Sequence, residues 1–97
     1  MAGKPHYQLT MYSLRTCRFC REKREQLRKQ HIAFEEHFID EDDSKWSEVT
    51  AKLERAGYPP SGYGTPIFEA NGKMLPNNPK MSLIKSTLRD SLPGAAG

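Results

Sequence analysis

Cysteine is scarce in this chain, and its scarcity excludes two classes of protein. Only two cysteines occur among the 97 residues. Two cysteines cannot form a disulfide-dense secreted scaffold, which needs several bridges, and they cannot supply the four thiolates of a Cys₄ zinc site. Long apolar runs are also missing. No stretch of about 18 apolar residues occurs, so no transmembrane helix is expected, and the first residues (MAGKPHY) lack the apolar core of a signal peptide.

The chain has little net charge and little length. Its formal charge is +3 at pH 7, so we expect neither a nucleic acid nor a membrane as a partner. At this size we expect one monomeric domain over residues 1–97, with flexible ends at residues 1–6 and 93–97. Without an export signal a cytoplasmic location is expected. In that reducing compartment a close cysteine pair is more often catalytic or metal-binding than structural.

Local patterns predict an alternating order of strands and helices. Segments rich in β-favouring residues predict strands over residues 7–13, 32–39, 65–70 and 73–75. Segments rich in helix formers predict helices over residues 18–30, 44–56 and 79–92. A β-α-β start implies a parallel strand pair, and Asn71-Gly72 adds an antiparallel hairpin. The order β-α-β-α-β-β-α therefore predicts an α/β fold with a mixed four-stranded sheet.

Several residues mark the expected helix ends. Asp43 or Ser44 is expected to cap the second helix, because a short acceptor side chain satisfies the free N–H groups of a first turn. Gly57 is expected to end that helix. Asn78 is expected to cap the last helix, with Pro79 in its first position.

Aromatic and aliphatic spacing predicts the core. Trp46 shares a helical face with Val49 and Leu53 and is therefore expected to be buried. Phe34 and Phe38 are also expected in the core. The last helix presents one apolar face, made by Met81, Ile84, Leu88 and Leu92.

The two cysteines form a C-x-x-C motif where a predicted strand leads into a predicted helix. The free N–H groups of a first helical turn favour negative charge. The thiolate of Cys17 is therefore stabilised, and its pKa is expected below the free value of about 8.5. Cys20 lies one turn further on, close enough for a disulfide but less exposed. This asymmetry suits an attacking thiolate at Cys17 and a resolving thiol at Cys20.

Positive charge gathers around the pair. Residues 14–30 contain seven basic residues and two acidic ones. Arg15 and Arg18 flank Cys17 and are candidates to stabilise its thiolate and contact a substrate. The bases at residues 23–29 are interpreted as a solvated helix face. Phe19, between the cysteines, and Tyr63, in a Pro/Gly-rich loop, are candidates to line the site.

Three other roles for the thiols remain open. Zinc needs two further ligands, which could come only from His6, His31 or His37 among the histidines. An iron–sulfur site needs ligands from a second chain or a small thiol. Two buried structural thiols are the third alternative. A metal-binding or cluster-carrying module is thus the alternative to an enzyme.

Two motifs make the chain resemble a known family. Residues 12–20 (YSLRTCRFC) resemble the glutaredoxin stretch in which a strand leads to C-P-Y-C. Residues 65–68 (TPIF), followed by residues 71–73 (NGK), resemble that family's second signature, in which a cis-proline precedes a strand and a hairpin. Over residues 7–92 the chain is thus similar to the glutaredoxin branch of the thioredoxin-like superfamily, and its C-terminal part to mycoredoxins. The resemblance implies an α/β/α sandwich.

The resemblance also implies a function and residue roles. Cys17 would be the nucleophile and Cys20 the resolving thiol of a small thiol–disulfide oxidoreductase that reduces protein or mixed disulfides. Pro66 would be the cis-proline, although an X–Pro bond by itself favours trans, and Thr65 would offer its backbone to an extended thiol substrate. Glutathione or another small thiol would be the co-substrate, with a thiol or thioredoxin-type reductase as electron source and no tightly bound cofactor.

Two segments differ from the family pattern. Arg18-Phe19 replaces the interior of C-P-Y-C. Residues 74–79 (MLPNNP) stand where the family has a Gly-Gly-x-Asp type motif for the γ-glutamyl end of glutathione. Another small thiol, or a protein thiol, is therefore an alternative co-substrate.

Overall fold

In the part of the chain that the structure describes, seven elements follow one another in the order predicted from the sequence. The structure is a computed structural model, which describes residues 8–59 and 64–90. The strands are β1 (Leu9–Ser13), β2 (Glu35–Phe38), β3 (Ile67–Ala70) and β4 (Lys73–Met74). The helices are α1 (Arg18–Lys29), α2 (Asp43–Ala56) and α3 (Met81–Asp90). The ends predicted to be flexible lie outside the described residues.

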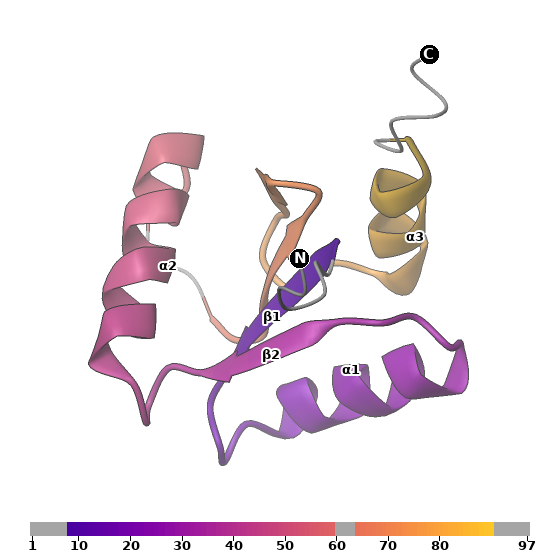
Figure 1. Cartoon of the computed structure of the whole chain (residues 1–97), viewed down its shortest axis with the longest axis horizontal. Coiled ribbons are helices and arrows are strands. Elements are labelled where there is room, and N and C mark those ends of the chain that lie inside the picture. The colour runs from indigo at the N-terminus through magenta and orange to yellow at the C-terminus, as the bar shows by residue number, and fades with distance from the viewer. Residues whose placement is uncertain (1–7, 60–63, 91–97) are drawn as a thin grey trace, which may run out of the picture.

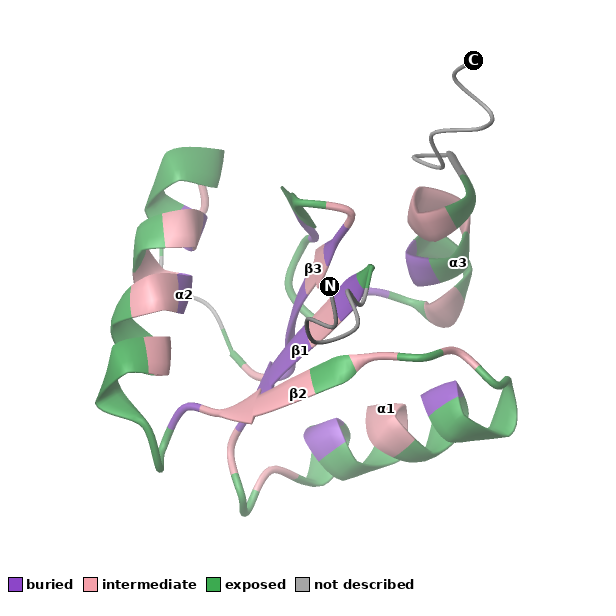
Figure 2. Ribbon diagram, viewed as in Figure 1, coloured by how far each residue is buried: buried purple, intermediate pink, exposed green. Residues whose placement is uncertain are grey.

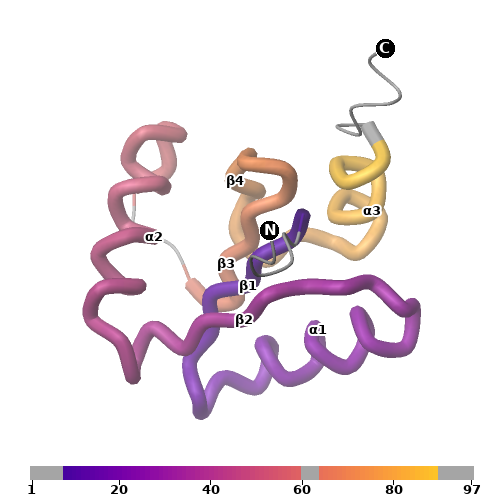
Figure 3. Tube along the Cα trace, in the orientation of Figure 1, coloured from indigo at the N-terminus to yellow at the C-terminus, as the bar shows by residue number. Residues whose placement is uncertain are grey.

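The strands form one mixed sheet in the order β2-β1-β3-β4. β1 pairs with β2 in parallel, with Ser13 opposite Phe38. β1 pairs with β3 antiparallel, with Tyr12 opposite Ile67, and β3 pairs with β4 antiparallel. Helix α2 lies on one side of the sheet, and α1 and α3 lie on the other (Figure 1; the short β4 is labelled in Figure 3). The architecture is the thioredoxin-like α/β/α sandwich that the resemblance implies.

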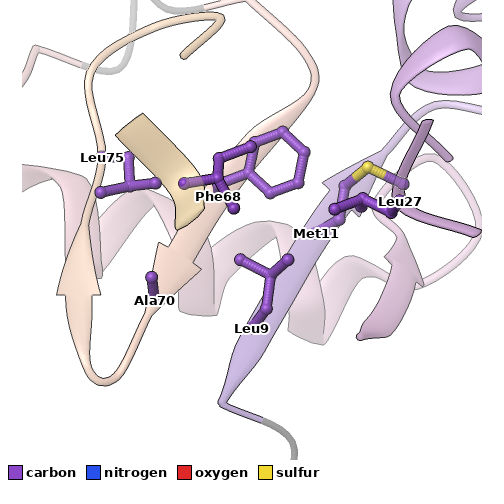
Figure 4. Packing of buried hydrophobic residues seen from close by; sticks show 7 residues of the cluster. Leu9, Met11, Leu27, Phe68, Ala70 and Leu75 are labelled. Atoms are coloured by element: carbon purple, nitrogen blue, oxygen red, sulfur yellow. The ribbon is translucent and has the colours of Figure 1, made fainter. Parts of the chain in front are cut away.

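Each face of the sheet has its own apolar cluster, because side chains alternate along β1. Leu9 and Met11 point to the side of α1 and α3, as Figure 4 shows. Their buried partners there are Leu27, Phe68, Ala70, Leu75 and Ile84. Tyr12 points to the side of α2, where it joins Ile39, Val49, Leu53, Ile67 and Met74. Apolar clusters therefore cover both faces of β1, the strand that leads to the cysteines. Most of β1 is buried, as the colours of Figure 2 show.

The prediction that Trp46 is buried is wrong. Its side chain is 48% exposed, whereas Val49 and Leu53 on the same helical face are at most 1% exposed. The apolar cluster on this side of the sheet includes Val49 and Leu53. Trp46 lies in the first turn of α2, outside this cluster. Phe34 and Phe38 are only half-buried.

The ends of α2 are close to those predicted. The N-cap is Asp42 rather than Asp43 or Ser44. The Asp42 carboxylate accepts hydrogen bonds from the Ser44 backbone N–H at 3.0 Å and from the Ser44 hydroxyl at 2.6 Å. Gly57 ends the helix in the left-handed conformation, with φ of 88°, as predicted.

The predicted start of the last helix is wrong by two residues. Asn78 has a φ of 49° and turns the chain instead of capping α3, because asparagine tolerates the left-handed region better than most residues. Pro79 is buried in this turn. The first helical carbonyl is that of Lys80, which accepts hydrogen bonds from the N–H groups of Leu83 and Ile84. Leu92 lies outside the described residues.

Candidate functional site

The cysteine pair lies at the end of β1, where the chain turns into α1. The N–H of Cys17 donates to the carbonyl of Leu14 at 3.2 Å, which closes the turn. Cys17 is the N-cap of α1 with extended backbone angles. Its Sγ accepts a hydrogen bond from the N–H of Cys20 at 3.0 Å. The sulfur thus occupies the position that a capping oxygen usually fills at the positive end of a helix.

Cys17 and Cys20 form a disulfide, with their Cα atoms 5.2 Å apart. Cys20 is completely buried, whereas Cys17 is half-buried. The exposures differ in the direction that the sequence predicts. A reagent in solution can therefore reach the first sulfur more readily than the second.

Thr65 and Pro66 lie beside the disulfide, although they are far from it in the sequence. The peptide bond between them is cis, as the resemblance implies, and Pro66 is buried. The hydroxyl of Thr65 donates to Sγ of Cys17 at 3.3 Å. Among the described residues, neither backbone group of Thr65 takes part in a hydrogen bond. The role expected for Thr65 concerned its backbone alone, so this hydroxyl contact is one that the sequence reasoning missed.

The segment after β4 holds the residue that precedes Thr65. The amide oxygen of Asn77 accepts a hydrogen bond from the N–H of Gly64 at 3.1 Å. Asn77 is one of the residues that stand in place of the family's Gly-Gly-x-Asp type motif. Its side chain therefore supports the chain next to Thr65.

The two arginines that flank Cys17 are both engaged with carboxylates. Arg15 Nε lies 2.8 Å from Glu41 Oε2, and the backbone N–H of Arg15 donates to Asp40 at 3.2 Å. Arg18 Nε lies 3.4 Å from Glu22 Oε2. All four of these side chains are largely exposed. Arg15 thereby joins the turn before α1 to the turn before α2, which lie close together in Figure 1.

Phe19 lies on the surface next to the cysteines. It is 58% exposed. It lines a shallow cavity of about 220 Å³ with Glu22, Lys23, Gln26 and Asn78. This cavity offers an aromatic face, both signs of charge and two amides. Tyr63, the other aromatic candidate, lies outside the described residues.

A polar network on the inner side of α1 was not predicted. Arg24 donates to both carboxylate oxygens of Glu36, at 2.8 and 2.6 Å, and the hydroxyl of buried Ser13 donates to Glu36 at 2.7 Å. Burial alone would raise the pKa of Glu36, but the hydrogen bonds from Arg24 and Ser13 hold it below its usual range. The interpretation of Arg24 as part of a solvated face is therefore wrong, because its side chain is only 19% exposed. The position of Arg24 along α1 does not indicate that the Glu36 carboxylate lies opposite it on β2.

A second network joins β1 to α2. The hydroxyl of Tyr12 donates to Glu48 at 2.6 Å, and Lys52 Nζ donates to Tyr12 at 3.0 Å and to Glu69 at 2.7 Å. Burial and the hydrogen bond to Glu48 raise the pKa of Tyr12 to about 12. The hydrogen bond from Tyr12 lowers the pKa of Glu48 to about 2, with help from nearby lysines.

Neither of the two described histidines, His31 and His37, forms a hydrogen bond or ion pair with the cysteine pair. His37 pairs with Glu35 at 2.8 Å, and His31 is exposed with a φ of 58°. His6 lies outside the described residues. In the part of the chain that the structure describes, no group of three or more histidine, cysteine or acidic side chains could hold a metal ion. Within the same residues, no helix is long and apolar enough to cross a membrane.

A larger cavity lies away from the disulfide. Its volume is about 530 Å³, and its lining includes Lys52, Arg55, Tyr58 and Lys73. The strand register places Glu69, which lines this cavity, opposite Thr10 near the start of β1, whereas Cys17 follows the end of β1. This cavity therefore belongs to the other end of the sheet.

The fold agrees with comparisons against solved structures. A glutaredoxin from Methanosarcina mazei Go1 is 20% identical with a TM-score of 0.64, over 84% of this chain and 78% of that one. A glutaredoxin from Archaeoglobus fulgidus is 22% identical with a TM-score of 0.62, over 91% and 99%. The holo form of a glutaredoxin from Populus tremula x tremuloides is 18% identical with a TM-score of 0.60, over 89% and 87%. At these identities the likeness shows the fold alone.

The family of this chain is shown by a match to a protein-family sequence model. No curated protein matches the chain significantly, and the similarity of the C-terminal part to mycoredoxins stays an expectation. The model described as glutaredoxin matches residues 9–65. That match covers more than half of the chain and runs from β1 through both cysteines to Thr65. The chain therefore belongs to the glutaredoxin family.

Proposed function

We propose that this protein is a thiol–disulfide oxidoreductase that uses Cys17 and Cys20 as a dithiol. The Cys17 thiolate attacks one sulfur of a substrate disulfide, forms a mixed disulfide and releases the other sulfur as a thiolate. Cys20 then loses its proton and attacks Sγ of Cys17, which releases the second substrate thiolate. The substrate gains two electrons, and the protein is left with the Cys17–Cys20 disulfide.

The unequal burial of the two sulfurs is the observation that carries this proposal. Cys17 is half-buried at the N-cap of α1, and Cys20 is completely buried behind it. A partly exposed cysteine at a helix N-terminus suits attack on an external disulfide, because the thiolate is the reactive form and the helix favours its charge. A buried sulfur suits the intramolecular step, because that step needs no access from solution.

The residues around Cys17 support the binding of an extended thiol substrate. Thr65 precedes the cis bond to Pro66, and its backbone groups can pair with a substrate backbone as a further strand would. Arg15 and Arg18 stand at the rim of the site, where their guanidinium groups, although each is paired with a carboxylate, can still contact a substrate. We include Tyr63 in the substrate-binding set on the sequence argument alone.

A small thiol such as glutathione is the proposed co-substrate. The cavity beside Phe19 offers Lys23 for a carboxylate and Glu22 for an ammonium group, so it suits a zwitterionic thiol. Two such thiols restore the dithiol. The first attacks Sγ of Cys17 and releases the Cys20 thiolate, and the second attacks the sulfur of the bound small thiol and releases the Cys17 thiolate. Such a cycle suits a reducing compartment such as the cytoplasm.

Two serine variants test the assignment of roles. Cys17→Ser should abolish reduction of a small mixed disulfide, whereas Cys20→Ser should retain that reaction and accumulate a mixed disulfide with a protein substrate. Mass spectrometry detects the trapped adduct by its added mass. Full activity of Cys17→Ser, or adducts on Cys20 in the wild-type protein, would contradict the proposal.

A coupled assay identifies the electron source. The same protein is supplied in turn with glutathione plus its reductase, with a mycothiol-like thiol, and with a thioredoxin reductase. We expect turnover with a small thiol and a slower rate with the protein reductase alone. Turnover with the protein reductase only would overturn the assignment of a small-thiol co-substrate, while leaving the roles of the two cysteines intact.

A further inference from the structure

The Thr65 hydroxyl makes a direct contact with the sulfur that we assign as the nucleophile. The two residues are 48 positions apart, and Oγ1 of Thr65 lies 3.3 Å from Sγ of Cys17. The sulfur of a disulfide carries no hydrogen, so the hydroxyl must be the donor. The N–H of Cys20 donates to the same sulfur at 3.0 Å. Two donors from separate parts of the chain therefore converge on one sulfur.

We propose that Thr65 is a catalytic residue, whose hydroxyl donates a hydrogen bond that strengthens when Sγ of Cys17 becomes a thiolate. The sulfur of a disulfide is a weak acceptor, whereas hydrogen bonds to an ionised group are about twice as strong as neutral ones. The contact thus favours the reduced, charged state over the oxidised one. This inference rests on the oxidoreductase function proposed above.

The arginines next to Cys17 stabilise its thiolate less than such a hydrogen-bond donor does. The Arg15 guanidinium is paired with Glu41 at 2.8 Å, and that of Arg18 with Glu22 at 3.4 Å. Each pair carries no net charge, and all four side chains are largely exposed, so solvent screens their field. A donor within hydrogen-bond distance of the sulfur therefore has the larger effect.

The surroundings of Thr65 hold its hydroxyl in place. Pro66 is buried immediately after it. Two residues before Pro66, the N–H of Gly64 is held by the side chain of Asn77 at 3.1 Å. A donor that is already aimed at the sulfur needs no reorganisation when charge develops there.

The hydroxyl acts at a defined step of the cycle. The second small thiolate attacks the sulfur of the small thiol that is bound to Cys17. The bond between that bound sulfur and Sγ of Cys17 then breaks, and the electron pair stays on Sγ. The small thiol leaves as its own symmetric disulfide, and Cys17 leaves as the thiolate. Stabilisation of this leaving sulfur by Thr65 favours regeneration of the dithiol.

Two substitutions at Thr65 separate the hydroxyl from the bulk of the side chain. Thr65→Val removes the hydroxyl and keeps the β-branched shape, whereas Thr65→Ser keeps the hydroxyl and removes the methyl group. Both are made in the Cys20→Ser background, where Cys17 is the only thiol, and the thiolate absorbance is titrated. We expect the valine variant to raise the Cys17 pKa by about one unit and the serine variant to stay near the Thr65 protein.

The redox equilibrium of the intact dithiol gives an independent measurement. At a pH above the Cys17 pKa of both proteins, Thr65→Val should shift the dithiol–disulfide equilibrium about tenfold toward the disulfide, which is about 30 mV for two electrons. Well below both pKa values the difference should vanish, because neither reduced protein carries the thiolate. A purely structural effect of the substitution would not follow the ionisation of Cys17.

The possible results decide between this inference and its alternatives. An unchanged Cys17 pKa in Thr65→Val overturns the role of the hydroxyl. Equal shifts in Thr65→Val and Thr65→Ser also overturn it, because they assign the effect to packing. Neither result affects the function proposed above, which fails if Cys17→Ser remains active or if adducts form on Cys20 in the wild-type protein. Circular dichroism of each variant establishes that the fold is retained.

Discussion

The guanidinium of Arg24 binds both carboxylate oxygens of Glu36 and thereby joins α1 to β2. The two distances are 2.8 and 2.6 Å, and the side chains are only 19% and 13% exposed. The Arg24 guanidinium also lies 5.7 Å from the ring centre of Phe38. Because α1 contains Cys20 and is capped by Cys17, this ion pair helps to fix the helix of the disulfide on the sheet.

Arg24→Met should destabilise the protein by about 2 kcal/mol, because it leaves the Glu36 carboxylate mostly buried with Ser13 as its remaining side-chain donor. Chemical denaturation of the oxidised protein measures the change. Lys29→Met is the matched control, since Lys29 is an exposed cation of the same helix, and it should cost less than about 0.5 kcal/mol. Equal losses in the two variants would show that the Arg24–Glu36 pair adds no stability beyond that of a surface charge.

The Tyr12 hydroxyl predicts a loss of stability at alkaline pH. The residue is buried, and its pKa is raised from 10.0 to about 12. A raised pKa in the folded state means that the unfolded chain loses this proton first. The stabilising effect is therefore complete below pH 10 and is lost as the pH rises to about 12. The loss should be about 2 kcal/mol.

Tyr12→Phe is the variant that isolates this effect. It cannot ionise, so its free energy of unfolding should fall less steeply than that of the wild-type protein between pH 10 and 12. At pH 7 it should itself be about 1 kcal/mol less stable, because Glu48 and Lys52 each lose a hydrogen-bond partner. Parallel pH profiles for the two proteins would argue against Tyr12 as the group responsible.

The exposure of Trp46 predicts that this large side chain adds little to stability. Trp46→Ser should cost less than about 1 kcal/mol, because its ring is already half in water. Leu53→Ala, on the same helix but fully packed in the core, should cost about 3 kcal/mol. Thermal unfolding of both variants compares them directly. A cost for Trp46→Ser as large as that for Leu53→Ala would show that Trp46 is packed in solution.

The elements could be predicted from the sequence because their signals are local. Asn71-Gly72 gives the hairpin between β3 and β4, and Gly57 ends α2 with a positive φ. The spacing of Cys17 and Cys20 places both sulfurs on one turn of α1. These signals depend on residues within a few positions of one another, so backbone geometry alone relates them to structure.

The error at Trp46 arises because burial depends on what lies opposite a residue. Val49 and Leu53 meet the apolar face of the sheet, whereas Trp46 shares their helical face but extends beyond that cluster. A second error concerns Asn78, whose residue type often caps the N-terminus of a helix. In the structure Asn78 turns the chain, and α3 begins only at Met81. Spacing along a helix identifies a face, but it does not say how far the neighbouring layer extends.

Local sequence identified the residues that we propose to carry the chemistry: two cysteines at a strand–helix junction and a Thr-Pro pair that resembles a family signature. The tertiary structure decided what each sulfur and each charge meets. It brings the hydroxyl of Thr65 to Cys17 across 48 positions, and it joins Arg24 to Glu36 between layers. Such contacts depend on how β3 and β2 pair with β1, and that pairing is fixed by packing across the whole sheet rather than by any short segment.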